Sequence, residues 1–147
     1  MSTLEGLVAL RIDDQVPALK GRVEDIAALA ALIEAGALPQ HDVCAFVAPL
    51  GFDDRGAESA VNTHTQAIEE TIAVVLAIKA RGDAKAQKAL PTIGQLKEDV
   101  LNAVAGWAPN SSVGVFNVRR GRLISAAKGL VLYQLEFSLL DQLRITA

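Results

Sequence analysis

Histidine and cysteine, the side chains most often used for acid–base and nucleophilic chemistry at neutral pH, are scarce in this chain. The 147-residue sequence contains only His41, His64 and Cys44. If His41 and Cys44 lie in one strand, their side chains point to opposite faces, which argues against an activated thiolate. The apolar segment DVCAFVAPL instead predicts that Cys44 is a small buried side chain. A single cysteine also excludes an intramolecular disulfide and a multi-cysteine metal site.

The common motifs of phosphate binding, metal-dependent hydrolysis and acyl transfer are absent from the sequence. It contains no GxGxxG, P-loop, HExxH or GxSxG pattern, and so it lacks the donors and nucleophiles that those chemistries need. We therefore expect a protein that is not an enzyme, with no catalytic residues and no cofactor.

A polar segment, GFDDRGAESAVNTHT, spans residues 51–65 and holds many of the remaining candidate side chains. His64 with Asp53, Asp54 and Glu58 could bind a metal ion, but a solvated loop explains the same composition, and we expect no metal. The segment is punctuated by glycine and lacks clear periodicity, so it predicts a long, mobile and functional loop. Its candidate contact residues in an assembly are Asp53, Asp54, Arg55, Glu58, Asn62 and His64.

One cluster of basic residues stands out, formed by Arg119, Arg120 and Arg122. The simpler interpretation is a solvated strand edge that discourages sheet-to-sheet aggregation. The functional interpretation is an ion-pairing patch for an acidic face of another protein. Its possible acidic counterparts are Glu69, Glu70 and Asp99.

The composition fits a single domain over residues 1–147. Hydrophobic residues make up 51% of the chain and aromatic residues only 4%, because small and aliphatic side chains carry the apolar share. A chain of this length buries about two-thirds of its surface in one core. The net charge of −3 argues against a dedicated nucleic-acid binder. No apolar run is long enough to span a membrane and the N-terminus does not resemble a signal peptide, so we expect a protein that stays in the cytoplasm.

Two helices are predicted near the N-terminus. The sequence STLE is a capping box that would begin the first helix at Thr3, and Pro17 would end it. A short edge strand at residues 19–23 is weakly indicated. Asp25 is the expected N-cap of a second helix, IAALAALIEA, which Gly36 would end. Its expected buried stripe is Ile26, Leu29, Leu32 and Ile33.

Two apolar strands should follow. Residues 42–48 are apolar on both faces, which predicts an interior strand that Pro49-Leu50-Gly51 ends. Residues 66–79 carry large aliphatic side chains at even positions, whereas odd positions such as Ala73 and Ala77 are small. The large face should meet the helices. The small face should be covered closely, either from within the chain or by a neighbouring subunit.

A third helix precedes the C-terminal strands. Apolar residues at spacings of three and four from Leu90 to Trp107 indicate an amphipathic helix, in which Trp107 packs on the core. Pro91 requires that this helix either starts near Leu90 or bends there after a looser turn from Lys85.

A β-meander should complete the fold, with strands at residues 113–119, 122–127 and 130–140 and a hairpin turn at Lys128-Gly129. In the last strand the core face should hold Val131, Tyr133, Leu135, Phe137 and Leu139, and the outward face Gln134, Glu136 and Ser138. The predicted fold class is α+β, with a mixed, largely antiparallel sheet packed against two to three helices in a single domain.

Three segments carry a resemblance to a known family. They are TQAIEETIAVVLAIKARGDA, LKEDVLNAVAGWAP and RRGRLISAAKGLVLYQLEFSLL. In this order they resemble the tail terminator proteins of long-tailed bacteriophages, over residues 45–137. The features that match are an apolar strand ending in a turn, a helix that closes with GW-x-P, and GRL before a hairpin. None of these is a catalytic motif.

The resemblance implies a structural virion protein. It implies a homo-oligomer, a hexameric ring that binds the tail tube protein, ends tube polymerisation and offers a docking surface to the head–tail connector or head completion protein. Genome DNA would only pass through the lumen, and no membrane would be bound. The protein would lie at the head-proximal end of the tail, after assembly in the host cytoplasm.

Two other interpretations stay open at this point. Another phage neck or tail tube component would differ mainly in forming open stacks or in binding the head first. A small ligand-binding α+β domain would require a pocket with convergent polar groups, for which the apolar segments hold few titratable residues.

Overall fold

A computed structural model describes residues 3–80, 89–110, 113–127 and 129–146 of the chain. Within these residues, three α-helices and a short 3-10 helix accompany five β-strands. The helices are α1 (Leu4–Gln15), η1 (Pro17–Leu19), α2 (Ile26–Ala35) and α3 (Ala89–Val104). The strands are β1 (Val23–Asp25), β2 (Val43–Ala60), β3 (Thr63–Lys79), β4 (Asn117–Ala127) and β5 (Leu130–Thr146).

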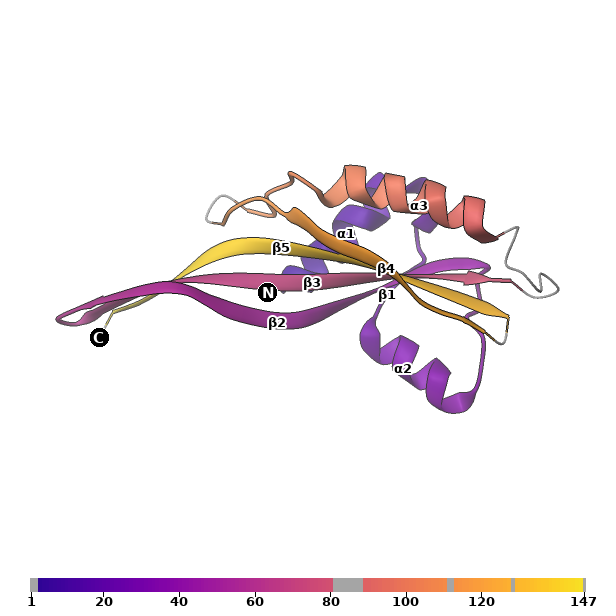
Figure 1. Cartoon of the computed structure of the whole chain (residues 1–147), viewed down its shortest axis with the longest axis horizontal. Helices are drawn as coiled ribbons and strands as arrows, with labels where there is room; N and C mark the ends of the chain where they lie inside the picture. Colours follow the sequence, from indigo (N-terminus) through magenta and orange to yellow (C-terminus); the bar gives the residue numbers. More distant parts are fainter. Residues whose placement is uncertain (1–2, 81–88, 111–112, 128, 147) are drawn as a thin grey trace.

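The strands form one mixed sheet in the order β1-β2-β3-β5-β4. β1 pairs with β2 in parallel, and every other pair is antiparallel. Helices α1 and α3 cover one face of the sheet, and α2 lies against the other face at one end (Figure 1). The α+β, single-domain prediction is confirmed.

The helix boundaries follow from local capping chemistry. Thr3 is the N-cap of α1, because its Oγ1 accepts a hydrogen bond from the Gly6 backbone N–H at 3.1 Å. The helix therefore begins at Leu4, one residue later than predicted, and it ends before Pro17 as predicted. The edge strand predicted at residues 19–23 is wrong over most of its length, since η1 occupies its start and β1 begins only at Val23.

The other two helices lie where the sequence predicts them. Asp25 caps α2 by accepting from the Ala28 N–H at 3.1 Å, and Gly36 ends the helix with a φ of 64°. α3 is described from Ala89 to Val104, with Pro91 near the start of this span, where a helix tolerates proline. The looser turn from Lys85 falls outside the described residues.

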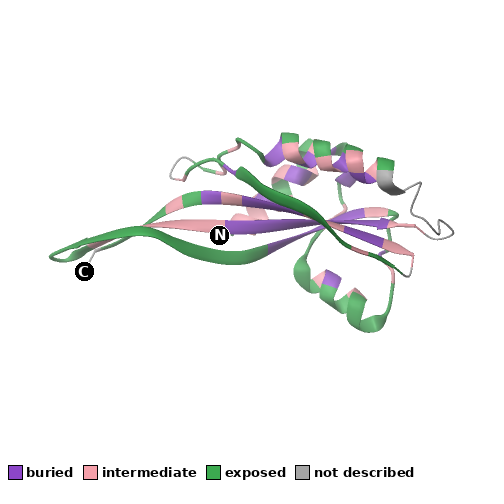
Figure 2. Cartoon of the chain, viewed as in Figure 1, coloured by how far each residue is buried: buried purple, intermediate pink, exposed green. Residues whose placement is uncertain are grey.

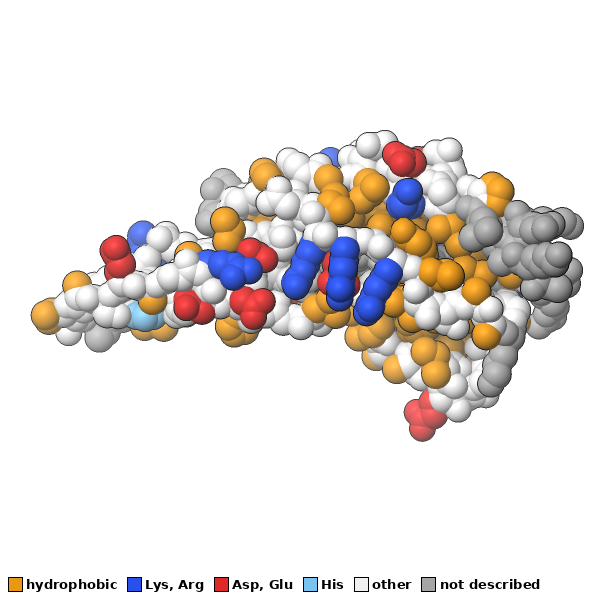
Figure 3. Space-filling model, viewed as in Figure 1, with side chains coloured by type: hydrophobic (Ala, Val, Ile, Leu, Met, Phe, Trp, Pro, Cys, Tyr) orange, Lys and Arg blue, Asp and Glu red, His pale blue; other side chains and the backbone are white. Residues whose placement is uncertain are grey.

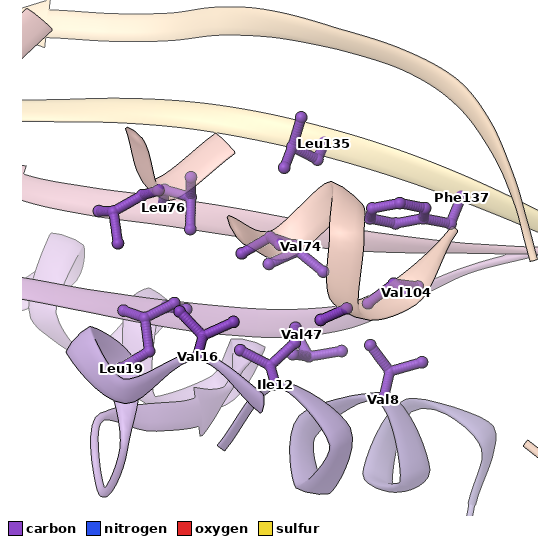
Figure 4. Close-up of a cluster of buried hydrophobic side chains, with 14 of the residues drawn as sticks. Val8, Ile12, Val16, Leu19, Val47, Val74, Leu76, Val104, Leu135 and Phe137 are labelled. Carbon is purple, nitrogen blue, oxygen red and sulfur yellow. The ribbon is translucent and has the colours of Figure 1, made fainter. Parts of the chain in front are cut away.

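The main core lies between the sheet and helices α1 and α3. The even face of β3 contributes Ile72, Val74, Leu76 and Ile78, which confirms that the large face meets the helices. Figure 4 shows Val8 and Ile12 of α1 and Val104 of α3 turned toward Val74 and Phe137 on the strands. The predicted core face of β5 is also correct: four of its five residues are buried and Tyr133 is partly buried.

A second, smaller core lies under α2. It joins Leu29 of the helix to a set from the other sheet face, namely Cys44, Phe46, Val75, Ala77 and Leu132. The small face of β3 is therefore covered from within the chain at this end. The stripe predicted for α2 is only partly correct, because Ile26 and Ile33 are 40% and 61% exposed. A helix that packs over one end of a sheet buries a single row of its side chains, and Leu29 and Leu32 supply that row.

The loop predicted at residues 51–65 is wrong. This segment is the distal half of a long β-hairpin, in which β2 and β3 pair until Ala60 meets Thr63, with a turn at Val61 and Asn62. Register shifts at residues 49–51 and 54–57 interrupt the alternation of side chains, and Gly51 and Gly56 both adopt a φ of 120° there. These bulges hid the strand, and Pro49-Leu50-Gly51 does not end it.

The predicted three-stranded meander is also wrong. Residues 113–116 are not in a strand, and the two segments expected at residues 113–119 and 122–127 are replaced by one strand, β4. A register shift between Val118 and Arg120 bends this strand where a turn was expected. The hairpin into β5 is present, with Gly129 at a φ of 77°, although Lys128 lies outside the described residues.

Three strands continue beyond the helices as an arm (Figure 1). We define the arm as residues 49–60 of β2, the turn at residues 61–62, residues 63–70 of β3 and residues 140–146 of β5. At ~3.3 Å per residue its central strand spans roughly 25 Å. Figure 2 shows that the buried parts of the strands lie near the helices, whereas β2 is exposed throughout the arm. In the part of the chain that the structure describes, no residue of the arm belongs to either core cluster.

The separation of core and surface leads to a matched test. Leu76→Ala should lower the free energy of unfolding by about 2–5 kcal/mol, because Leu76 is fully buried and its loss leaves a cavity. Leu10→Ala makes the same chemical change at a side chain that is 63% exposed, and its effect should stay within about 0.5 kcal/mol. Chemical denaturation followed by circular dichroism compares the two, and equal losses would contradict this core assignment.

Candidate interaction surface

The residues predicted to make contacts fall into two groups in the structure. One group lies on the arm: Asp53, Asp54, Arg55, Glu58, Asn62, His64, Glu69 and Glu70. The other group, Arg119, Arg120 and Arg122, lies on β4. In Figure 3 a row of basic side chains crosses the middle of the molecule, with acidic side chains beside it on the side of the arm.

A chain of hydrogen bonds links polar side chains across the arm. His64 contacts Ser59 Oγ through Nδ1 at 2.6 Å and Gln66 Oε1 through Nε2 at 3.1 Å. Gln66 Nε2 in turn donates to Asp54 Oδ1 at 2.9 Å, which also accepts the Gly56 N–H at 2.9 Å. The Gly56 bond, followed by the Gln66 bond, lowers the pKa of Asp54. These bonds link side chains of β2 to side chains of β3 across the arm.

The metal-binding alternative gains no support from this arrangement. Both ring nitrogens of His64 are used by neutral partners, Ser59 and Gln66. Across the part of the chain that the structure describes, no group of three or more histidine, cysteine or acidic side chains could hold a metal ion.

Arg55 and Glu69 form a two-point ion pair on the arm. Arg55 donates from Nε to Glu69 Oε2 at 3.0 Å and from Nη2 to Oε1 at 3.3 Å. The bond from Arg55 lowers the pKa of Glu69. Glu70 differs, because burial, then the nearby charges of Asp141 and Glu5, raise the pKa of its carboxyl group. Asn62 occupies the hairpin turn with a φ of 65°, a conformation that asparagine tolerates well.

The basic cluster has an internal partner that the sequence analysis missed. Arg120 Nε donates to Glu136 Oε2 at 2.8 Å, and Gln134 Nε2 donates to the same oxygen at 3.0 Å. The Glu136 side chain is only 3% exposed, so the prediction that it faces solvent is wrong. Burial acts to raise the pKa of Glu136, but the bonds from Arg120 and Gln134 outweigh it, and the pKa is lowered.

The acidic counterparts expected for the cluster on another protein stay a prediction. Within this chain, Glu69 pairs with Arg55, and the charge of Arg119 also lowers the pKa of Glu69. Asp99 accepts a bond from Gln95 within α3. Arg119 donates a hydrogen bond from Nη1 to a neutral acceptor, the Oγ1 of Thr71 on β3, at 3.2 Å. The signal that could have identified Glu136 was the strand register, since Arg120 lies directly opposite it.

Apolar side chains on the arm were also missed. Phe52 is 68% exposed and Val61 at the tip is 90% exposed. Four more aliphatic side chains on the arm are at least 40% exposed: Leu50, Leu140, Leu143 and Ile145. An exposed group of this size on a projecting element is typical of an assembly surface.

The histidine and cysteine pair does not form a catalytic site. Cys44 is buried as predicted, and burial is the main cause that raises the pKa of its thiol to about 11. A thiol with this pKa is a poor nucleophile at neutral pH. His41 precedes β2 and, with Cys44, borders a cavity of about 330 Å³ beside α2.

The comparisons with known proteins decide the family. A family model described as phage tail terminator protein matches residues 4–146, nearly the whole chain. The chain belongs to the phage tail terminator protein family. This confirms the resemblance inferred from the sequence. A search among curated proteins finds no match.

Phage tail terminator proteins are structural tail components and not an enzyme family, so this chain is a structural component of a virion tail. Its partners are other proteins of the tail or head. None of the helices in the described ranges combines the length and apolar character that a membrane crossing requires.

The buried carboxylate yields a test by pH. At neutral pH, Glu136→Gln should lower the free energy of unfolding by about 1–3 kcal/mol, because it removes charge-assisted hydrogen bonds. The pKa of Glu136 is lowered on folding, so this stabilisation is complete above the unfolded-state pKa, about 4.3, and is lost as the pH falls through the folded-state value. Denaturation midpoints from pH 7 to pH 3 measure the difference from the wild type.

The control for this test is Glu58→Gln, at an exposed carboxylate of the arm. It should change stability little at any pH. A Glu136→Gln deficit that stayed constant down to pH 3 would contradict the assignment of an ionised, paired Glu136.

Proposed function

We propose that this phage tail terminator protein forms a hexameric ring that caps the tail tube, ends tube polymerisation and presents a docking surface to the head–tail connector. The observation that carries the proposal is the arm, a three-stranded extension outside the core with exposed apolar side chains. Family membership supplies the tail as the place of assembly.

The physical argument rests on what the arm leaves uncovered. A small isolated sheet is only marginally stable in water, and this one projects from the body without a helix over its residues. Its outer strands, β2 and the part of β5 beyond Leu140, also present free edges, which are templates for pairing with another chain. Association with other proteins would cover both the exposed side chains and the free edges.

A ring of this kind would also explain how growth of the tail tube ends. A head-to-tail interface within a ring closes after a fixed number of copies. One face of the closed ring would bind the last ring of tube protein, and the opposite face would lack a surface that another tube ring fits, so that growth stops. That face would be free for the connector or head completion protein at the head-proximal end of the tail. DNA would pass through the lumen, and the net charge of −3 disfavours its retention there.

Native mass spectrometry tests the oligomer, using the purified protein alone and mixed with its tail tube protein. We expect a hexamer of the 15.5 kDa chain in at least the mixture, and electron microscopy should show one ring at the end of each tube. Persistent monomers or dimers in both samples would contradict the ring. Open stacks of the protein would instead support a tube or neck component.

The arm can be tested separately by shortening it. A variant in which Asn-Gly replaces residues 56–66 keeps the pairing of Asp54 with Ile68 and closes the hairpin with a favourable two-residue turn. Because the removed residues belong to neither core, the melting temperature should change by only a few degrees. The variant should fail to cap tubes in an in vitro assembly assay. If tubes assembled with it end at normal lengths, the arm has no role in capping.

A further inference from the structure

We propose that neighbouring copies in the ring join edge to edge, with the acidic β2 edge of one arm lying along the arginine-bearing β4 edge of the next subunit. The proposal rests on the ring described above and adds which surfaces form it. The occupant of each edge is therefore a second copy of this chain.

The first observation is that two long strand edges are free in the described structure. β1 pairs with β2 only at residues 45–47, so the arm part of β2 is bonded on one side, to β3. β4 is bonded only to β5. The two free edges have similar lengths, the 11 residues of β4 and residues 49–60 of β2. They also lie on opposite sides of the sheet, which is the arrangement that lets identical sheets join side by side.

The second observation is the charge of the two edges. β4 contains three arginines and no acidic residue. The arm part of β2, residues 49–60, contains three carboxylates and one arginine, so its net charge is −2. Within the described residues, the side chains of Arg122 and Glu58 have no hydrogen-bond or ion-pair partner. Arg119 donates to the Thr71 hydroxyl, and its charge also acts on Glu69 and Glu136 in the same chain, so it is less available than Arg122. Charges that lack partners within one copy are available to another.

The third observation is that the opposite charges share a face. Successive side chains of a strand alternate between the two faces, and residues opposite each other share one. Arg120 and Arg122 lie opposite Glu136 and Gln134, on the face that bears α2. Asp53 lies opposite Glu69 and Glu58 opposite Thr65, and these odd positions of β3 are on that same face. When two edges pair, same-face side chains become cross-strand neighbours, where opposite charges attract.

These charges also exclude the competing pairings. Two β4 edges would bring arginines together, and two arm edges would bring carboxylates together, which is unfavourable in both cases. Of these two long edges, the combination left is a β2 edge against a β4 edge. Because it uses different surfaces on the two copies, it is a head-to-tail interface, the type that forms a ring when the rotation between copies closes. Exposed Leu123 and Ile124 on β4 and Phe52 on the arm add apolar area along the joined edges.

Charge reversal with complementation tests this interface. The β4 variant carries Arg119→Glu and Arg122→Glu, and the arm variant carries Asp53→Arg and Glu58→Arg. Arg120 is kept because it pairs with Glu136 in the same chain. Each variant alone should need at least about tenfold more protein to form rings, because each contact places like charges together. An equal mixture of the two should restore rings, since arms and β4 edges of opposite charge then alternate.

The control is Glu98→Arg, which reverses an exposed charge on α3 and should assemble as the wild type does. Circular dichroism melts confirm that each variant folds. If the wild type forms rings and both edge variants also form them normally, or if the mixture fails to recover, the edge interface is overturned while the ring stands. If the wild type forms no ring with the tube protein present, both proposals fail.

Cross-linking provides a second measurement that does not depend on charge. Glu58→Cys and Arg122→Cys in one chain should give an oxidised ladder of multimers on a denaturing gel, in the presence of tube protein. Cys44 can stay in place, because it is buried and its thiol pKa is about 11. Rings that form without any cross-linked ladder would overturn the edge-to-edge arrangement.

Discussion

The continuous pairing of β3 with β2 and β5 is the constraint on which the rest of the structure depends. β3 pairs with β5 without interruption from Thr63 to Lys79, and with β2 over nearly the same length. One end of these strands is held by both core clusters, and the other end forms the arm. The arm needs no core of its own, because the folded body fixes its register and direction.

The unequal faces of β3 explain why the helices are placed as they are. Large side chains at Ile72, Val74 and Leu76 need the two helices α1 and α3 to bury them. The small side chains Val75 and Ala77 leave a shallow face, for which the single row of α2 suffices. Helix α2 covers only one end of this face, and polar side chains lie on the face beyond the helix. One of them is the buried Glu136, which pairs with Arg120 at the edge of the sheet.

The sequence predicted best where one physical signal acted alone. The caps at Asp25 and Gly36, the even face of β3 and the core face of β5 were all read from local chemistry or strict alternation. It failed where bulges broke that alternation, so that residues 51–65 were taken for a loop and β4 for two strands. Of the candidate contacts, Arg55 with Glu69 and Arg120 with Glu136 depend on register, which distant segments set. Exposed Phe52 was hidden within the segment taken for a loop.

The ion pair of Arg120 with Glu136 explains how the edge strand β4 can carry three arginines without a large loss of stability. Three arginines within four positions repel one another, and a buried carboxylate beneath them offsets one charge and fixes one side chain. Arg119 is held by Thr71, while Arg122 stays exposed without a charged partner in the described chain. The row thus keeps a net positive charge on a strand whose backbone remains open. An edge with this charge repels a second β4 edge and attracts an acidic edge, and the proposed head-to-tail ring depends on such a difference between its two edges.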